Sequence, residues 1–64
     1  GDITRWSIFF FKGILKFQSG SLFEARNAFE TALYYNPVFQ PALQKLQEVN
    51  KVIKDHDRVM IKFR

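Results

Sequence analysis

The chain has 64 residues, of which 47% are hydrophobic, and it contains eight phenylalanines and no cysteine. Ten Lys and Arg residues against six Asp and Glu residues give a formal net charge of +4. This length allows one small domain, and the absence of cysteine excludes disulfide bonds and cysteine-ligated metal sites.

The first predicted element is a helix over residues 4–18. Asp2 or Thr4 supplies a side-chain oxygen for the free N–H groups of its first turn. Gly20 lies in a turn over residues 18–21, where glycine can take the left-handed conformation that ends a helix. Apolar residues surround this helix on almost all sides, which is typical of a helix buried all round. They form one row of Ile3, Trp6, Phe10, Ile14 and Phe17 and a second row of Ile8, Phe11 and Leu15.

A second helix is predicted over residues 21–36. Ser21 and Glu24 have the spacing of a capping box, in which the Ser hydroxyl and the Glu carboxylate each accept a free backbone N–H. Pro37 ends the helix, because the residue before a proline is driven out of the α region. The apolar face has helical spacing and consists of Ala25, Ala28, Phe29, Ala32 and Leu33.

The third predicted helix covers residues 40–60, with Pro41 at a tolerated first-turn position. Its apolar seam alternates steps of four and three over three heptads. A helix that covered the whole seam would have about 23 residues and a length of roughly 34 Å, so it should extend beyond the shorter hairpin. Residues 58–64 also alternate as a strand would, after a turn at residues 55–57. The seam consists of Ala42, Leu46, Val49, Ile53, His56, Met60 and Phe63.

Six positions share the spacing of a known repeat unit: Phe9, Gly13, Ala25, Phe29, Ala32 and Pro37. Together they resemble one degenerate tetratricopeptide repeat over residues 6–39. The resemblance implies an all-α fold, in which small residues let two antiparallel helices approach and Phe29 fills the space between them. The helix that follows would begin a next repeat or cap the array. Lys12 and Lys16 depart from the pattern, which usually has Leu and Tyr at these places.

The same resemblance implies a peptide-binding groove along the first helix. Phe10 and Ile14 stand where members that grip a C-terminal carboxylate have Lys and Asn. We therefore expect the groove to accept an apolar helix or extended segment. Aromatic residues dominate interface energetics, which makes Trp6, Phe10 and Phe11 the expected anchors. The predicted partner-binding residues are Trp6, Phe10, Phe11, Ile14, Phe17 and Gln18.

Catalysis has little support in the sequence. His56 is the single histidine, and the side chains of neighbouring helix positions such as Asp55 and Asp57 point about 100° away from it. No cysteine, second histidine or Gly-rich phosphate loop completes a site. We expect no enzymatic activity, no bound metal and no cofactor.

We expect a non-catalytic protein–protein interaction module that acts as a scaffold, adaptor or assembly factor of a multi-protein complex. The apolar content exceeds what so small a domain can bury, which favours a protein partner. A second interface, through which the third helix could self-associate, is predicted at Val49, Ile53, Met60 and Phe63. Stable arrays need about three repeats, so we expect a piece of a longer chain or a small subunit of a complex.

The alternative function is a basic helical module that binds a membrane surface or nucleic acid. Six of the ten basic residues lie at or after Lys45, and Trp6 with Lys12 and Lys16 resembles an interfacial helix. Acidic residues interrupt the basic region, which argues against nucleic acid. No segment has the ~20 apolar residues of a membrane span. The absence of cysteine favours a reducing intracellular compartment.

Overall fold

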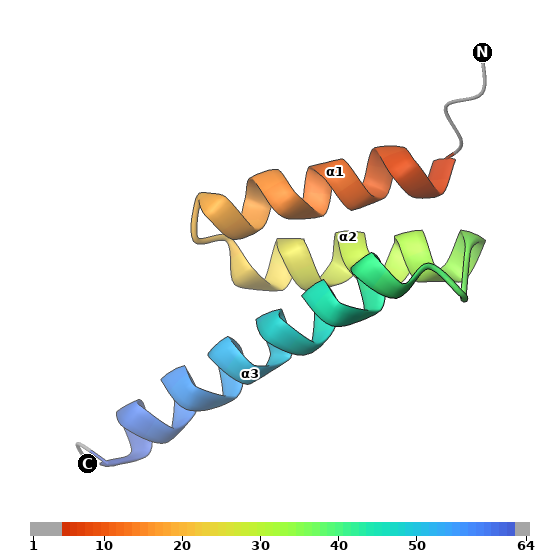
Figure 1. The fold of residues 1–64 in the computed structure, drawn as a ribbon. Helices are drawn as coiled ribbons and strands as arrows, with labels where there is room; N and C mark the ends of the chain where they lie inside the picture. The colour runs from red at the N-terminus through yellow and green to blue at the C-terminus, as the bar shows by residue number, and fades with distance from the viewer. Residues whose placement is uncertain (1–4, 63–64) are drawn as a thin grey trace.

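The computed structural model describes the backbone of residues 5–62 and the side chains of residues 5–55. It consists of three helices: α1 (Arg5–Gln18), α2 (Leu22–Tyr35) and α3 (Gln40–Lys62). The predicted all-α fold, a helical hairpin followed by a long third helix, is confirmed, and no strand occurs in residues 5–62. Figure 1 shows α2 between α1 and α3, with the C-terminal part of α3 extending beyond the hairpin.

The turn between α1 and α2 is built around Gly20, which has φ +85°. The N–H of Ser21 donates to the carbonyl of Lys16 at 2.9 Å, and the N–H of Gly20 donates to the carbonyl of Phe17 at 3.1 Å. This pair of bonds is the Schellman motif, which satisfies two of the free carbonyls at the end of a helix. The expected left-handed glycine at this place is therefore confirmed.

The predicted capping box of α2 is wrong. Ser21 precedes the helix but its side chain makes no capping hydrogen bond. The Ser21 N–H, which the capping box assigns to Glu24, is already engaged by the carbonyl of Lys16. Glu24 instead forms an ion pair with the Lys16 ammonium at 2.9 Å, across the turn from α2 to α1. The Schellman motif therefore uses the Ser21 N–H, the donor that the capping box would need for its bond to Glu24.

Asn36 and Pro37 end α2 as the sequence predicts. Asn36 has φ −141° and ψ 81°, outside the α region, while its N–H still donates to the carbonyl of Ala32. The third helix then runs unbroken from Gln40 to Lys62, two residues beyond the predicted end. The alternative strand at residues 58–62 is therefore wrong, because no Gly or Pro interrupts the helix after Pro41.

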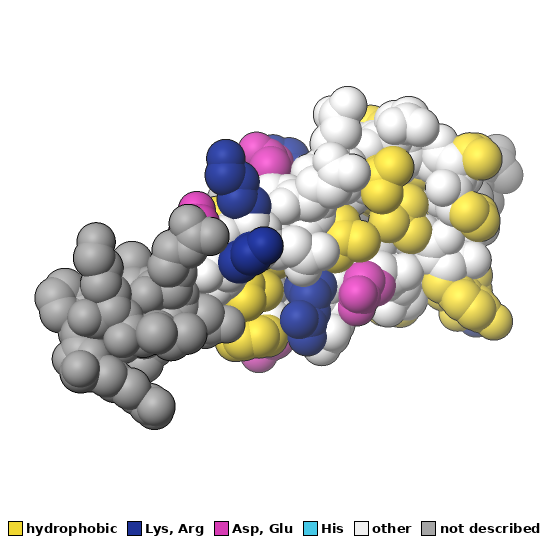
Figure 2. All heavy atoms as spheres, turned by 90° about the horizontal axis from the view of Figure 1, so that it is seen from below, with side chains coloured by type: hydrophobic (Ala, Val, Ile, Leu, Met, Phe, Trp, Pro, Cys, Tyr) yellow, Lys and Arg dark blue, Asp and Glu magenta, His cyan; other side chains and the backbone are white. Residues whose placement is uncertain are grey.

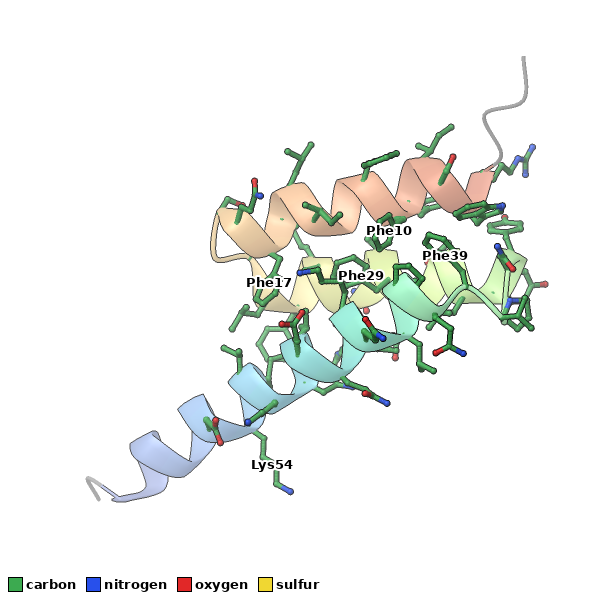
Figure 3. All side chains as sticks on the ribbon, in the orientation of Figure 1. Phe10, Phe17, Phe29, Phe39 and Lys54 are labelled. Carbon is green, nitrogen blue, oxygen red and sulfur yellow. The ribbon has the colours of Figure 1, made fainter. Side chains whose placement is uncertain are left out.

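The core lies where all three helices meet. Ala25, Phe29 and Val49 form its centre, and each has none of its surface exposed. Phe29 projects from α2 into this core (Figure 3), where it packs with residues of both α1 and α3. The prediction placed it only between the two helices of the hairpin. The side chains that surround this centre are partly exposed: Phe10, Ile14, Phe17, Leu22, Leu46 and Ile53.

Phe39, just before α3, joins the first and third helices through aromatic contacts. Its ring centroid lies 4.3 Å from that of Trp6 and 5.0 Å from that of Phe10, the latter in an edge-to-face arrangement. The ring of Phe10 also lies 5.8 Å from that of Phe29. Edge-to-face and tilted pairs are the favoured aromatic geometries. This cluster therefore fixes the start of α3 against the N-terminal half of α1.

Candidate interaction surface

The predicted groove residues lie mainly on the inner side of α1. Phe10, Ile14 and Phe17 pack against the core, and Trp6 contacts Phe39. All four are half-buried. In Figure 3 the labelled Phe10 and Phe17 project from α1 towards the other helices rather than away from them. These side chains therefore contribute first to the fold, and only their remaining exposed parts are available to a partner.

The second apolar row of α1 is the freely accessible one. Ile8, Phe11 and Leu15 are 54%, 63% and 66% exposed. Phe11 and Leu15 each lie two positions from Gly13, the buried residue of α1 that faces α2. Two positions correspond to about 200° around a helix, so these side chains point away from α2. We name Ile8, Phe11 and Leu15 the outer row.

The two edges of the outer row differ in charge. Arg5 and Lys12 are exposed and seven positions apart, which places them on the same edge. The other edge carries Gln18, the predicted binding residue, which is exposed. The helix contains no acidic residue. The outer row is therefore an apolar stripe with one basic edge and one edge that has no charge.

The third basic residue of α1 is neutralised within the chain. The Lys16 ammonium, by its hydrogen bond and then by its charge, holds the pKa of Glu24 below its usual value of 4.5, with a smaller contribution from Lys12. Both side chains of this ion pair are well exposed to solvent, so its contribution to stability is small. Lys16 is thereby occupied, whereas Arg5 and Lys12 form no ion pair with any side chain of residues 5–55.

A shallow groove of about 290 Å³ runs between α1 and α2, beside the basic edge. Its floor contains Ala28, and the Thr31 hydroxyl at its side donates to the carbonyl of Asn27. The lining contains no nucleophile paired with a base, which acid–base or covalent catalysis would need. The full lining is Phe9, Lys12, Glu24, Asn27, Ala28 and Thr31.

Other exposed apolar side chains do not form a comparable row. Phe23 lies under the guanidinium of Arg26, 5.2 Å from the ring centroid. Tyr34 and Tyr35 contact each other edge to face at 5.2 Å, and Tyr35 stacks on Phe9. Phe23 and the two tyrosines lie at opposite ends of α2. Val38 lies in the loop before α3, and the exposed Leu43 and Val52 are nine positions apart on α3. Among the exposed large apolar side chains of residues 5–55, the outer row is therefore the set in which three follow one another along a helix at steps of three and four.

The predicted second interface requires a correction at Val49. This residue is completely buried in the core of its own chain, so it is not available for self-association. Ile53 packs against the same core and is half-buried. The side chain of Met60 and the whole of Phe63 lie outside the described part of the molecule. The physical reason is that the first turns of the seam face α2, and only later turns extend beyond the hairpin.

The described part of α3 presents mixed charges. Figure 2 shows Lys and Arg side chains interspersed with acidic and apolar ones on the face seen from below. Lys45 forms an ion pair with Glu48 at 3.3 Å, and Lys54 is followed by Asp55. A continuous basic stripe, which nucleic-acid binding favours, is not present over residues 40–55.

Membrane spans and metal sites have no counterpart in the described residues. None of the three helices, over residues 5–62, is long and apolar enough to cross a bilayer. The described side chains contain no group of three or more His, Cys, Asp and Glu placed to hold a metal ion. The side chains of His56 and Asp57 lie outside the described set.

No protein-family model, curated protein or solved structure matches this chain. The fold and the exposed side chains are therefore the basis for a proposal of function. The sequence indicates both apolar rows of α1 but not which of them faces outward. The signal that separates them is Gly13: a small residue marks the line of closest helix contact, and the row two positions away from it lies opposite.

Proposed function

We propose that this chain is a non-catalytic protein–protein interaction module that docks a helix of a partner on the outer row of α1. The observation that supports the proposal is the exposure of Ile8, Phe11 and Leu15 on the side of α1 opposite α2. Covering large apolar side chains that are more than half exposed gains on the order of 1 kcal/mol for each. Three aligned side chains are enough for a small hot spot with an aromatic residue at its centre.

The arrangement of the helices supports a stacking role. Helix α1 packs on α2 and α2 packs on α3, and no helix of residues 5–62 covers the side of α1 that faces away from α2 (Figure 1). The resemblance to a tetratricopeptide repeat is consistent with this role, because such units bury a continuous core only when neighbours stack on them. The module would then serve as a scaffold or assembly factor, with a partner helix as the next layer.

A selection experiment tests the proposal even though the partner is not identified. A displayed library of helix-forming peptides is selected against the purified chain, and enriched peptides are assayed against two variants. Replacing Phe11 and Leu15 together with Glu should abolish binding. The matched control, Phe23→Glu, changes an equally exposed aromatic residue on α2 and should leave binding intact. Enriched peptides that bind the outer-row variant as well as the wild-type chain would refute the proposal.

A membrane surface is the second candidate occupant, because an apolar row beside Arg5 and Lys12 also suits an anionic bilayer. Co-sedimentation with vesicles of phosphatidylcholine and phosphatidylserine separates the two. Binding that depends on Phe11 and falls steeply with salt would favour the membrane. Nucleic acid has less support, since Glu48 and Asp55 break up the described basic residues of α3.

A further inference from the structure

We infer that the helix docked on the outer row is acidic: an amphipathic helix whose apolar seam is bordered by Asp or Glu. This inference rests on the proposed function and deepens it by giving the chemistry of the partner. The supporting feature is the basic edge formed by Arg5 and Lys12, on a helix that has no acidic residue of its own.

The two cations of the basic edge are available to a partner. Glu24 forms its ion pair with Lys16 at 2.9 Å and not with Lys12. Arg5 and Lys12 are exposed, and among residues 5–55 neither has an ion-pair partner. Their separation of seven positions repeats the spacing with which charged residues flank the seam of a coiled coil. A facing helix with carboxylates two turns apart can therefore meet both.

A symmetric dimer of the chain through two outer rows does not supply these carboxylates. If two α1 helices faced each other antiparallel across a two-fold axis, their basic edges would lie on the same side of the interface. A parallel pair would place each basic edge against the uncharged edge that carries Gln18. Neither arrangement neutralises Arg5 and Lys12, and the antiparallel one brings like charges together, which disfavours association.

The narrowness of the row favours a helix over a bilayer. An interfacial helix buries a broad apolar face in the headgroup region. In α1 the apolar residues that would widen this face, Phe10 and Ile14, are packed on the core. Ile8, Phe11 and Leu15 follow steps of three and four, the rhythm of a seam between two packed helices. The exposed face thus has the width and spacing of a helix–helix contact.

Two stapled helical peptides serve as probes. They share a Leu seam at steps of three and four and differ only in the residues on both edges of this seam, which are Glu in one peptide and Lys in the other. Each peptide is titrated into the full chain by fluorescence anisotropy at 50 and 300 mM NaCl. The Glu peptide should bind about five- to tenfold more tightly at low salt, and the ratio should shrink at high salt.

Charge reversal on the chain gives the decisive comparison. Lys12→Glu should remove the preference for the Glu peptide and move it towards the Lys peptide. The matched control is Lys54→Glu. Lys54 lies on α3, away from α1 (Figure 3), so this substitution should leave the preference unchanged. An equal response to both substitutions would mean that net charge alone governs binding, and it would overturn the inference.

The remaining outcomes separate this inference from the proposed function. If both peptides bind equally and Leu15→Gln weakens both, the outer row docks helices but the acidic partner is refuted. If neither peptide binds, the proposed function itself fails. If neither peptide binds but vesicles containing phosphatidylserine bind in a Phe11-dependent way, the basic edge serves a membrane surface and both proposals are overturned.

Discussion

The ring of Phe29 lies directly against the backbone of Gly13, at the place where α2 crosses α1. A Cβ atom on Gly13 would lie 2.6 Å from Cε1 of this ring and 2.7 Å from Cδ1. Real Cβ atoms do not approach ring carbons so closely. Because Phe29 is completely buried, its ring cannot swing out to make room. Gly13, which has no side chain, and the large ring of Phe29 therefore together set the distance between α1 and α2.

Gly13→Ala should destabilise the chain although alanine is the better helix former. The exchange gains up to about 1 kcal/mol in helix propensity. Overpacking a filled core costs roughly 1–3 kcal/mol, so the net result should be a loss of up to about 2 kcal/mol. Urea denaturation followed by circular dichroism measures this change. Gly13→Ala should cost less in a Phe29→Leu background than in the wild-type chain, because the smaller side chain leaves room for the methyl group.

L-Ala and D-Ala in place of Gly20 should change the free energy of unfolding in opposite directions. Its φ of +85° is strained for an L-residue, and no other atom lies within 4 Å of the place of a Cβ. Gly20→Ala should therefore lose on the order of 1–2 kcal/mol through backbone strain alone. D-Ala at the same position, introduced by chemical synthesis, fits this φ and restricts the unfolded chain, so it should stabilise. Equal destabilisation by both enantiomers would show that the loss comes from crowding and not from backbone handedness.

Phe39→Ala should loosen α3 from α1, and the chain contains its own reporter of this change. Trp6 is the single tryptophan and its ring lies 4.3 Å from that of Phe39. Removing the Phe39 ring should shift the Trp6 fluorescence to longer wavelength. Loss of two aromatic contacts and of the buried area should lower the free energy of unfolding by roughly 2 kcal/mol. The exposed Phe23, changed to Ala in parallel, should leave the emission of Trp6 unaltered.

Local signals in the sequence predict the elements well. Gly20 marks the left-handed turn, Pro37 marks the end of α2, and the long apolar seam predicts a third helix that extends beyond the hairpin. The first two signals act through the backbone of their own residue or its immediate neighbours, whereas the seam acts through side chains at helical spacing. Helical spacing also predicts the buried face of α2, on which Phe29 lies with Ala25 and Ala32.

Contacts between elements are harder to predict. Nothing in the sequence singles out Phe39, because its meeting with Trp6 depends on the angle at which α3 crosses α1. The sequence places Glu24 in a cap because the competing hydrogen bond from Ser21 to Lys16 arises only once the Schellman turn has formed. The exposure of the outer row likewise depends on which side of α1 meets α2. The apolar pattern alone gives both rows equal weight, and only the small residue Gly13 marks the side of α1 that faces α2.

The ion pair between Glu24 and Lys16 should make a small contribution to the free energy of unfolding, and this contribution should depend on pH in the acid range. Since the folded pKa of Glu24 lies below its ordinary value of 4.5, the contribution is present above pH 4.5 and is lost as the pH falls through the folded pKa. Glu24→Gln should therefore lower the urea midpoint slightly at pH 7, and the two proteins should converge as the pH falls below the folded pKa of Glu24. The control is Glu30→Gln, an exposed change elsewhere on α2 at a residue without an ion pair in residues 5–55, and it should leave the urea midpoint at pH 7 unchanged.

Substitution by Glu should change the stability of the chain very differently at Phe10 and at Phe11, two neighbouring residues of α1. Phe10 packs on the core and contacts both Phe29 and Phe39, so Phe10→Glu should cost roughly 2–4 kcal/mol. A chain of this size has only about 3–9 kcal/mol of stability, so this variant should lose a large share of its stability. Phe11 points away from α2 and is 63% exposed, so Phe11→Glu should change stability by less than about 0.5 kcal/mol.

Circular dichroism and urea titration of both variants measure this difference. The comparison also decides between the two rows as a binding surface. If Phe10→Glu kept its helical content while Phe11→Glu unfolded, Phe11 and not Phe10 would face the core. The assignment of the outer row as the exposed face of α1 would then be wrong. A folded Phe11→Glu variant that no longer binds helical peptides would assign the loss to the surface itself, because the core that supports this surface is unchanged.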